Sequence, residues 1–354
     1  MTGLYLLCAL FSSALCSYEI EIEIAAAVHS ATEEALRSLP CPEPADIFPC
    51  VCTVGTENRM VMNCSAVESE DQLARVFSSN IPFTKFYKLE IEGNRNLKVL
   101  RKGDLGPVSF QFIHIEKGVL EEVQYEAFAQ SYATAESIDL TLNNVSAFPF
   151  EELPLFTSLV NLLLTDNSIP VIPMLQSDSL SYINLVRNLF SEIPVGSFKG
   201  LKNISLINLF GNDIDAVLSD TFANLPSLNS VILATNRLSH IPRGTIKFNS
   251  TDDGFVNLST NTISSIAVDA ITGLNKGELH LWENSFSVLE EEVFRPLLEG
   301  GATIFLQHNP LACDCDMAWL ITNPQFMELI SSGTTCYNGE HLTDLDPSIF
   351  EDLC

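Results

Sequence analysis

The amino-acid sequence predicts an α/β solenoid, a stack of similar turns of chain whose strands line one concave sheet. The first observation is a marker residue that recurs every 21 to 25 residues, at positions 94, 118, 143, 167, 188, 212, 236, 261, 284 and 309. It is asparagine everywhere except at Gly118. The second is a set of apolar residues at constant offsets from each marker. A fixed period of this length indicates a repeat architecture and overrides the two globular domains that 354 residues would allow.

The repeat reads L-x-x-L-x-L-x-x-N-x-L, which is the pattern of the leucine-rich repeat. The turn around Asn236 shows it in full, with Leu228, Val231, Leu233 and Leu238. Val231 and Leu233 are two residues apart, so both side chains point into the stack. The marker amide is expected to bond backbone groups of the turn that would otherwise be buried without partners. The pattern therefore predicts a horseshoe of about ten repeats with a parallel concave sheet and a ladder of stacked amides.

Some repeats depart from this pattern. Leu97 comes one residue late after Asn94, which predicts a bulged loop at residues 93–96. The last three repeats have Asp253, Lys276 and Gly301 where the first leucine should stand. We expect looser packing there, or rearranged loops before those strands.

The cysteines form the third observation. Cys8 and Cys16 lie in the leading apolar stretch, and the other eight form two groups of four that flank the repeats: Cys41, Cys50, Cys52, Cys64 and Cys313, Cys315, Cys336, Cys354. A solenoid needs a cap over each exposed end of its core, and even cysteine counts in an exported protein indicate disulfides. A zinc site is the alternative, but the Cys-x-Cys spacing is tight for tetrahedral zinc. Spacing alone leaves three pairings open in each group.

The leading stretch predicts export. Residues 1–16 are read as a signal peptide, because residues 3–15 are almost wholly apolar or small and are too short to span a membrane comfortably. No Lys or Arg precedes the apolar run, which departs from the usual signal. The further divisions are a linker or pro-segment at 17–40, an N-terminal cap at 41–75, repeats at 76–308 and a C-terminal cap at 309–354. No anchor sequence follows Cys354, so the expectation is a secreted, extracellular protein without a membrane anchor.

Charge and motifs exclude several function classes. The net charge is −27, which disfavours nucleic acid and anionic membranes as partners. No two of the six histidines have metal-ligand spacing, and no nucleophile elbow, phosphate loop or dinucleotide fingerprint occurs. Asp252-Asp253-Gly254 lacks a full calcium ligand set. The sequence therefore predicts no enzyme, no cofactor and no metal.

The concave face is the predicted functional surface. Residues two, four and six positions before each marker project onto it, and those of the middle and C-terminal repeats are unusually apolar. An extended apolar patch usually marks a partner surface, and aromatic residues are favoured anchors. The predicted partner-binding residues are Tyr182, Phe210, Ile232, Phe255, Trp282 and Phe305. The alternative is that these side chains only pack on one another along the sheet.

Five N-x-S/T sequons predict glycosylation of an exported chain, at Asn63, Asn144, Asn203, Asn249 and Asn257. Asn257 lies between Val256 and Leu258, so its side chain is expected on the concave face. A glycan there would obstruct part of that face.

The run Asn309-Pro310-Leu311, followed by Cys313-x-Cys315-x-x-x-Trp319-Leu320, closely resembles the C-terminal cap of the secreted, cysteine-capped leucine-rich repeat family. The resemblance covers about residues 41–354. It implies that the first cysteine of each group pairs with the third and the second with the fourth, giving Cys41–Cys52, Cys50–Cys64, Cys313–Cys336 and Cys315–Cys354.

The acidic layout and the stretch Leu89-Glu90-Ile91-Glu92-Gly93-Asn94 also resemble a narrower group, the non-catalytic subunits of shrimp luciferase complexes. That resemblance implies a protein partner, a separate catalytic chain, and no oxygenase chemistry in this one. The leading hypothesis is a secreted scaffold that binds a protein through its concave face. The alternative is an extracellular innate-immune recognition protein that binds microbial glycan or lipid. A glycan reader should show more polar residues between its aromatics.

Overall fold

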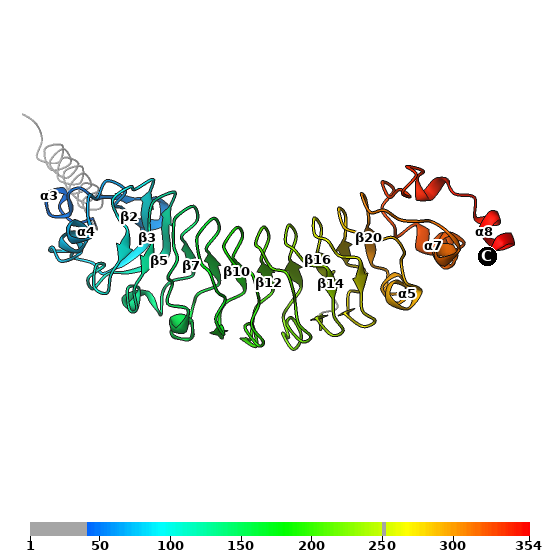
Figure 1. Ribbon diagram of the computed structural model, residues 1–354. Helices are drawn as coiled ribbons and strands as arrows, with labels where there is room; N and C mark the ends of the chain where they lie inside the picture. The colour runs from blue at the N-terminus through cyan, green and yellow to red at the C-terminus, as the bar shows by residue number, and fades with distance from the viewer. Residues whose placement is uncertain (1–40, 250–252) are drawn as a thin grey trace, which may run out of the picture.

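The computed structural model describes residues 41–249 and 253–354. The predicted signal peptide at 1–16 and linker at 17–40 lie outside the described residues, as do Cys8 and Cys16. Figure 1 shows the repeats as one continuous arc between the two ends of the chain.

One sheet of twelve strands runs the length of the arc, and ten of its strands belong to the ten markers. These ten pair in parallel with their neighbours, so that Tyr182 lies beside Leu206 and Asn184 beside Asn208. They are β3 (Lys85–Glu92), β5 (Ser109–Glu116), β7 (Ser137–Asp139), β8 (Asn161–Leu163), β10 (Tyr182–Asn184), β12 (Leu206–Asn208), β13 (Ser230–Ile232), β16 (Phe255–Asn257), β19 (Glu278–His280) and β20 (Thr303–Phe305). The predicted ten-repeat horseshoe is confirmed.

The strands separate the core from the concave surface by simple alternation. In β10 the central Ile183 is fully buried, whereas Tyr182 and Asn184 are half-buried on the concave side. The same pattern recurs in β8, β12, β16 and β20. The concave orientation predicted from the offsets is therefore correct.

The marker amides form the predicted ladder. The Asn212 Nδ2 donates to the carbonyls of Leu185 in the preceding repeat, at 3.1 Å, and Leu209 in its own, at 3.0 Å. Its Oδ1 accepts from the Asn188 amide at 3.1 Å. Each buried marker thereby satisfies backbone groups of two repeats at once, which locks their stacking distance.

Gly118 interrupts the ladder for a steric reason. A Cβ at this position would lie 2.8 Å from the Asn143 Oδ1 and 2.9 Å from the Asn94 carbonyl oxygen. With no amide at 118, the Asn94 Oδ1 accepts from the amides of Asn96 and Leu97 in its own loop. These bonds close a turn over residues 94–97, and the bulge itself stays a prediction.

The repeats without a leading leucine rearrange their loops. Asp253 and Lys276 are exposed, and Leu274 is buried in their place. Leu274 lies over Gly254 and Gly277, where its Cδ1 is 2.9 and 2.7 Å from the positions that Cβ atoms would occupy. The core is filled from a different point in the chain, so the second of the two predicted outcomes is the correct one.

The return side of each repeat is built from short elements. Parallel pairs join β4 (Val99–Leu100) to β6 (Glu122–Val123), β9 (Gln176–Ser177) to β11 (Gly200–Leu201), β14 (His240–Ile241) to β17 (Ser265–Ile266) and β15 (Ile246–Lys247) to β18 (Ile271–Thr272). The remaining elements here are the 3-10 helices η2 (Ala129–Ser131) and η3 (Phe150–Leu155), and helix α5 (Glu291–Glu299). Four buried phenylalanines occupy one offset inside these turns, at positions 128, 198, 222 and 294.

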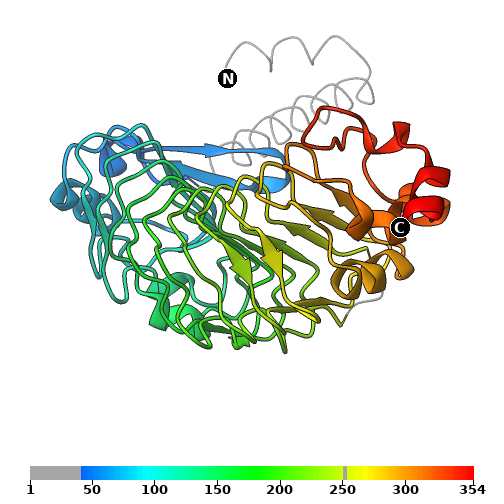
Figure 2. The ribbon, with the colours of Figure 1, turned by 45° about the vertical axis from the view of Figure 1, so that its right-hand side comes forward.

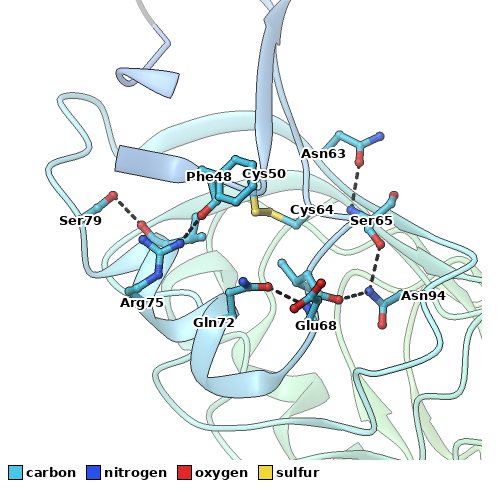
Figure 3. Close-up of a disulfide and its surroundings, with 12 residues drawn as sticks. Phe48, Cys50, Asn63, Cys64, Ser65, Glu68, Gln72, Arg75, Ser79 and Asn94 are labelled. Atoms are coloured by element: carbon cyan, nitrogen blue, oxygen red, sulfur yellow. Dashed lines mark hydrogen bonds between the residues drawn. A yellow bond between two sulfur atoms is a disulfide. The ribbon is translucent and has the colours of Figure 1, made fainter. Parts of the chain in front are cut away.

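The N-terminal end of the core is closed by the antiparallel hairpin β1 (Val51–Val54) and β2 (Met60–Asn63), with η1 (Thr56–Asn58) between them. Helices α3 (Pro44–Ile47) and α4 (Glu70–Phe77) flank the hairpin. Disulfides join Cys41 to Cys52 and Cys50 to Cys64. Figure 3 shows the second disulfide above the Asn94 amide, which donates to the Ser65 carbonyl and so ties the first ladder rung to this end.

The C-terminal end is covered by η4 (Cys315–Met317), α6 (Ala318–Ile321), α7 (Pro324–Met327), η5 (Leu342–Asp344) and α8 (Pro347–Leu353), which Figure 2 shows beside the last strands. Disulfides join Cys313 to Cys336 and Cys315 to Cys354. All four pairings implied by the family resemblance are confirmed. Trp319 donates from its indole nitrogen to the Leu289 carbonyl at 3.1 Å, so it anchors this end to the last repeats.

One buried acid lies on the return side. Glu152 is 1% exposed, and its Oε1 accepts from the Glu126 amide. Its Oε2 and the Tyr132 hydroxyl are buried without a hydrogen-bond partner among the described residues. Burial raises the pKa of Glu152, and the bond from the Glu126 amide offsets part of that rise. Burial, then the nearby Glu152, raises the pKa of Tyr132.

Replacing Glu152 by glutamine is expected to stabilise the protein by about 1 kcal/mol at neutral pH, because it removes a buried charge and puts an amide nitrogen beside the unpartnered Tyr132 hydroxyl, which can accept from it. The folded chain holds the Glu152 proton more tightly than the unfolded chain. Its contribution is therefore fully present below the ordinary glutamate pKa and is lost as pH rises through the raised pKa. Thermal unfolding of Glu152→Gln and wild type should converge towards about pH 4. The exposed neighbour Glu151→Gln is the control, and an equal gain there would contradict the assignment.

Candidate functional site

The concave face carries all six residues predicted to bind a partner. Each of the six is half-buried. Each lies in one of the strands β10, β12, β13, β16, β19 and β20 or two residues after its end. Register places Ile232 beside Asn257, and Phe305 beside His280. The six side chains therefore lie on one surface that extends over the six consecutive repeats of residues 182–305.

The middle of the face is neutral, with side-chain amides between the apolar groups. The Asn184 Nδ2 donates to the Tyr182 hydroxyl at 2.8 Å, and its Oδ1 accepts from the Val186 amide. The Asn208 Oδ1 accepts from the Phe210 amide at 3.1 Å. These bonds hold the amides in place, so the strip is less purely apolar than the sequence pattern indicates. It offers fixed hydrogen-bonding groups beside its aromatics.

The N-terminal part of the face is charged. Register places His114 between Glu90 and Asp139, and the His114 Nδ1 is 3.2 Å from a Glu116 oxygen. Burial, then the charge of Asp139, raises the pKa of Glu116. Burial, then the charge of Lys88, lowers the pKa of His114. This end therefore differs in kind from the neutral middle.

Aromatic rings gather at the C-terminal part of the face. The His280 ring stacks on Phe305 with centroids 4.2 Å apart and lies 5.0 Å from Phe255. Its Nε2 is 2.8 Å from a Glu278 oxygen. An open recess of about 350 Å³ lies beside this stack, lined by His280, Trp282, Glu283, Phe305, Gln307 and His308.

The structure brings the predicted residues together in two sets. Phe255, Trp282 and Phe305 surround His280 or its recess, whereas Tyr182, Phe210 and Ile232 extend over the neutral middle.

Glu283 and His308 also line the recess but were not predicted, because they directly precede a marker and lie outside the concave offsets. All ten residues at that place have a left-handed backbone: Gly93, Lys117, Leu142, Asp166, Arg187, Gly211, Thr235, Thr260, Glu283 and His308. Eight are not glycine, so no residue type signals this turn.

A second set of apolar side chains also escaped the sequence analysis. Tyr125, Met174 and Val195 lie seven residues after their markers and are 54%, 69% and 64% exposed. They lie on the return side of the repeats, away from the concave sheet. The sequence does contain a signal for this set, because all three residues lie at the same offset from their markers. Buried phenylalanines lie at a nearby offset, so the exposed set is easily taken for part of the core pattern.

The sequons differ in accessibility. Asn144, Asn203 and Asn249 are exposed, and Asn63 is half-buried. Asn257 lies in the concave strand β16, where its Oδ1 accepts from the Ser259 amide and hydroxyl. Glycosylation at all five stays a prediction. Within residues 41–249 and 253–354, no three His, Cys, Asp or Glu side chains gather to hold a metal, and no helix is long and apolar enough to cross a membrane.

Comparison with known proteins identifies the family. The non-catalytic subunit of Oplophorus-luciferin 2-monooxygenase from Oplophorus gracilirostris is 38% identical over 321 residues, which are 90% of this chain and 89% of that subunit. The chain belongs to the family of that subunit. The leucine rich repeat model matches residues 178–238. Mouse keratocan is 29% identical over 140 residues, which are 38% of this chain and 40% of keratocan.

Solved structures share the fold of this chain. The leucine-rich repeat horseshoe recurs in an octameric complex of Latrophilin 3, Unc5D and FLRT2, with a TM-score of 0.65, 19% identity, and coverage of 85% of this chain and 93% of that one. A TLR13 complex with a single-stranded RNA gives a TM-score of 0.57 and 20% identity, covering 69% of this chain and 34% of that one. At these identities the likeness concerns architecture.

Proposed function

We propose that this chain is a secreted, non-catalytic scaffold that binds a protein partner through the middle of its concave face. The observation that carries the proposal is the neutral strip around Tyr182, Phe210 and Ile232, which combines half-buried apolar groups with fixed amides on a rigid sheet. Such surfaces favour protein ligands, because aromatic anchors supply contact area at low entropic cost.

The relative from Oplophorus supports the proposal that the partner is a catalytic chain. The homologous protein from Oplophorus is named as a non-catalytic subunit, so a complex with a separate catalytic chain is the arrangement we propose here. The four disulfides of the described residues and the predicted signal peptide support export. A glycan or lipid function is not proposed, because the oxygens of Asn184 and Asn208 already accept from the backbone amides of Val186 and Phe210, and the homologous protein from Oplophorus is named as a subunit.

The test is purification of the native glycoprotein under mild conditions, identification of any stoichiometric partner by mass spectrometry, and titration of the two recombinant chains. Phe210→Asp is expected to weaken that complex at least about tenfold, because it places a charge in the contact area. Met174→Asp, on the return side, is the matched control and should bind as wild type does. Circular dichroism shows whether each variant is folded. A solitary monomer, or equal losses for both variants, would contradict the proposal.

A further inference from the structure

Two ion pairs join neighbouring repeats along the loop edge of the concave face. Lys117 and Arg187 each directly precede a marker and pair back to an acid of the preceding repeat. The Lys117 Nζ is 2.5 Å from a Glu92 oxygen, and the Arg187 Nη2 is 2.6 Å from an Asp166 oxygen. These pairs neutralise Glu92 and Asp166.

Glu283 occupies the same place as Asp166, directly before a marker, but the residue at that place in the next repeat is His308 rather than Lys or Arg. The Glu283 side chain is exposed, and its Oε2 accepts from the Thr260 hydroxyl at 3.1 Å. Within the described part of the chain, no Lys or Arg lies at ion-pair distance from it or from Glu278. One carboxylate, Glu283, therefore lines the aromatic recess without a strong base, and a second, Glu278, bonds the His280 ring that also lines it.

The recess joins these carboxylates to aromatic faces. Trp282 and Phe305 line it, and the His280 ring stacks on Phe305 and bonds Glu278. Aromatic faces attract cations through the ring quadrupole, and a neighbouring carboxylate adds a charge-assisted hydrogen bond. A volume of about 350 Å³ admits a side chain rather than a folded element.

We infer that this recess binds an arginine or lysine side chain of the protein partner, with Trp282 and Phe305 as the aromatic wall and Glu283 as the acceptor. The inference rests on the proposed function and names the chemistry at one end of the same face. A guanidinium suits the site best, because it stacks flat on an aromatic ring while donating sideways to a carboxylate. The net charge of −27 favours approach of such a basic group. The neutral middle of the face would then supply contact area, and the recess would fix the orientation of the bound partner.

The test uses the full secreted chain and a small probe, the peptide acetyl-Gly-Arg-Gly-amide, against its citrulline counterpart, which is neutral and nearly isosteric. The chain has two tryptophans, so Trp319→Phe leaves Trp282 as the only source of tryptophan fluorescence. In that background we expect saturable quenching by the arginine peptide, binding at least about tenfold weaker for citrulline, and a similar loss on Glu283→Gln. Glu192→Gln, an exposed acid on another face, should change nothing. If Trp319→Phe fails to fold, isothermal titration of the wild type and Glu283→Gln replaces the fluorescence.

Equal binding of the two peptides, or none, overturns the inference. Quenching by chitotriose instead would assign the recess to a neutral sugar. The two proposals fail separately. If Phe210→Asp abolishes partner binding while Glu283→Gln leaves it unchanged, the recess is not used and the scaffold function stands. If Phe210→Asp leaves the complex intact, the proposal that the partner binds through the middle of the face is wrong, whether or not the arginine peptide binds.

Discussion

Replacing Asn212 by alanine is expected to lower the free energy of unfolding by about 3 kcal/mol. The side chain is 6% exposed and lies in the middle of the amide ladder. Its removal leaves the backbone amides of Asn188 and Phe190 buried without their acceptor. The carbonyls of Leu185 and Leu209 lose one of two donors each and keep the side-chain amides of Asn188 and Asn236. Both backbone amides lie inside the packed stack, so each costs its desolvation penalty when its acceptor is removed. Chemical denaturation followed by circular dichroism measures the loss.

Asn208 is the matched control, four residues before Asn212 and on the concave side. It is half-buried, and its Oδ1 accepts only from the Phe210 amide, so Asn208→Ala should cost less than about 1 kcal/mol. Hydrogen exchange adds a second readout, because loss of a rung should open the repeats next to Asn212 first. If the two variants were equally stable, the ladder would not be what holds the repeats in register.

Much of the fold could be predicted because a solenoid repeats one local pattern. The offsets around Asn236 determine which side chains enter the core, and stacking then determines the sheet. What the pattern could not show was how a repeat compensates when it departs from the pattern. Leu274 fills the space of the missing leading leucines from a loop, which depends on three-dimensional proximity to Gly254 and Gly277.

The candidate site was only partly predictable for a related reason. Alternation places Phe255, Trp282 and Phe305 on the concave face, and the structure confirms that placement. Alternation says nothing about the turn that follows each strand. Glu283 reaches the recess because the residue before each marker turns with a positive φ, and that conformation is imposed by the stack and not by residue type.

Substituting alanine for Gly277 is expected to destabilise the C-terminal repeats by about 2–3 kcal/mol, because the added methyl overpacks the junction between two repeats. A Cβ there would lie 2.2 Å from the Gly254 carbonyl oxygen and 2.9 Å from the Gly254 amide nitrogen. Both atoms belong to backbone, which cannot swing away as a flexible side chain can. The Gly254 carbonyl also accepts from the Glu278 amide at 2.9 Å, so relief of the clash breaks the bond that starts β19.

This variant links stability to the proposed site, because β19 carries Glu278 and His280 into the aromatic cluster. Gly277→Ala should therefore lower the melting temperature and also weaken the arginine-peptide quenching of Trp282, while hydrogen exchange in β10 and β12 stays as in wild type. Gly55→Ala is the control, since its Cβ would meet only the Arg59 carbonyl at 3.6 Å and its backbone is extended. It should be neutral or slightly stabilising. A destabilised Gly277→Ala that binds the peptide normally would show that the recess keeps its shape without the Gly254–Glu278 bond, and would separate the packing of these repeats from the binding chemistry at their concave edge.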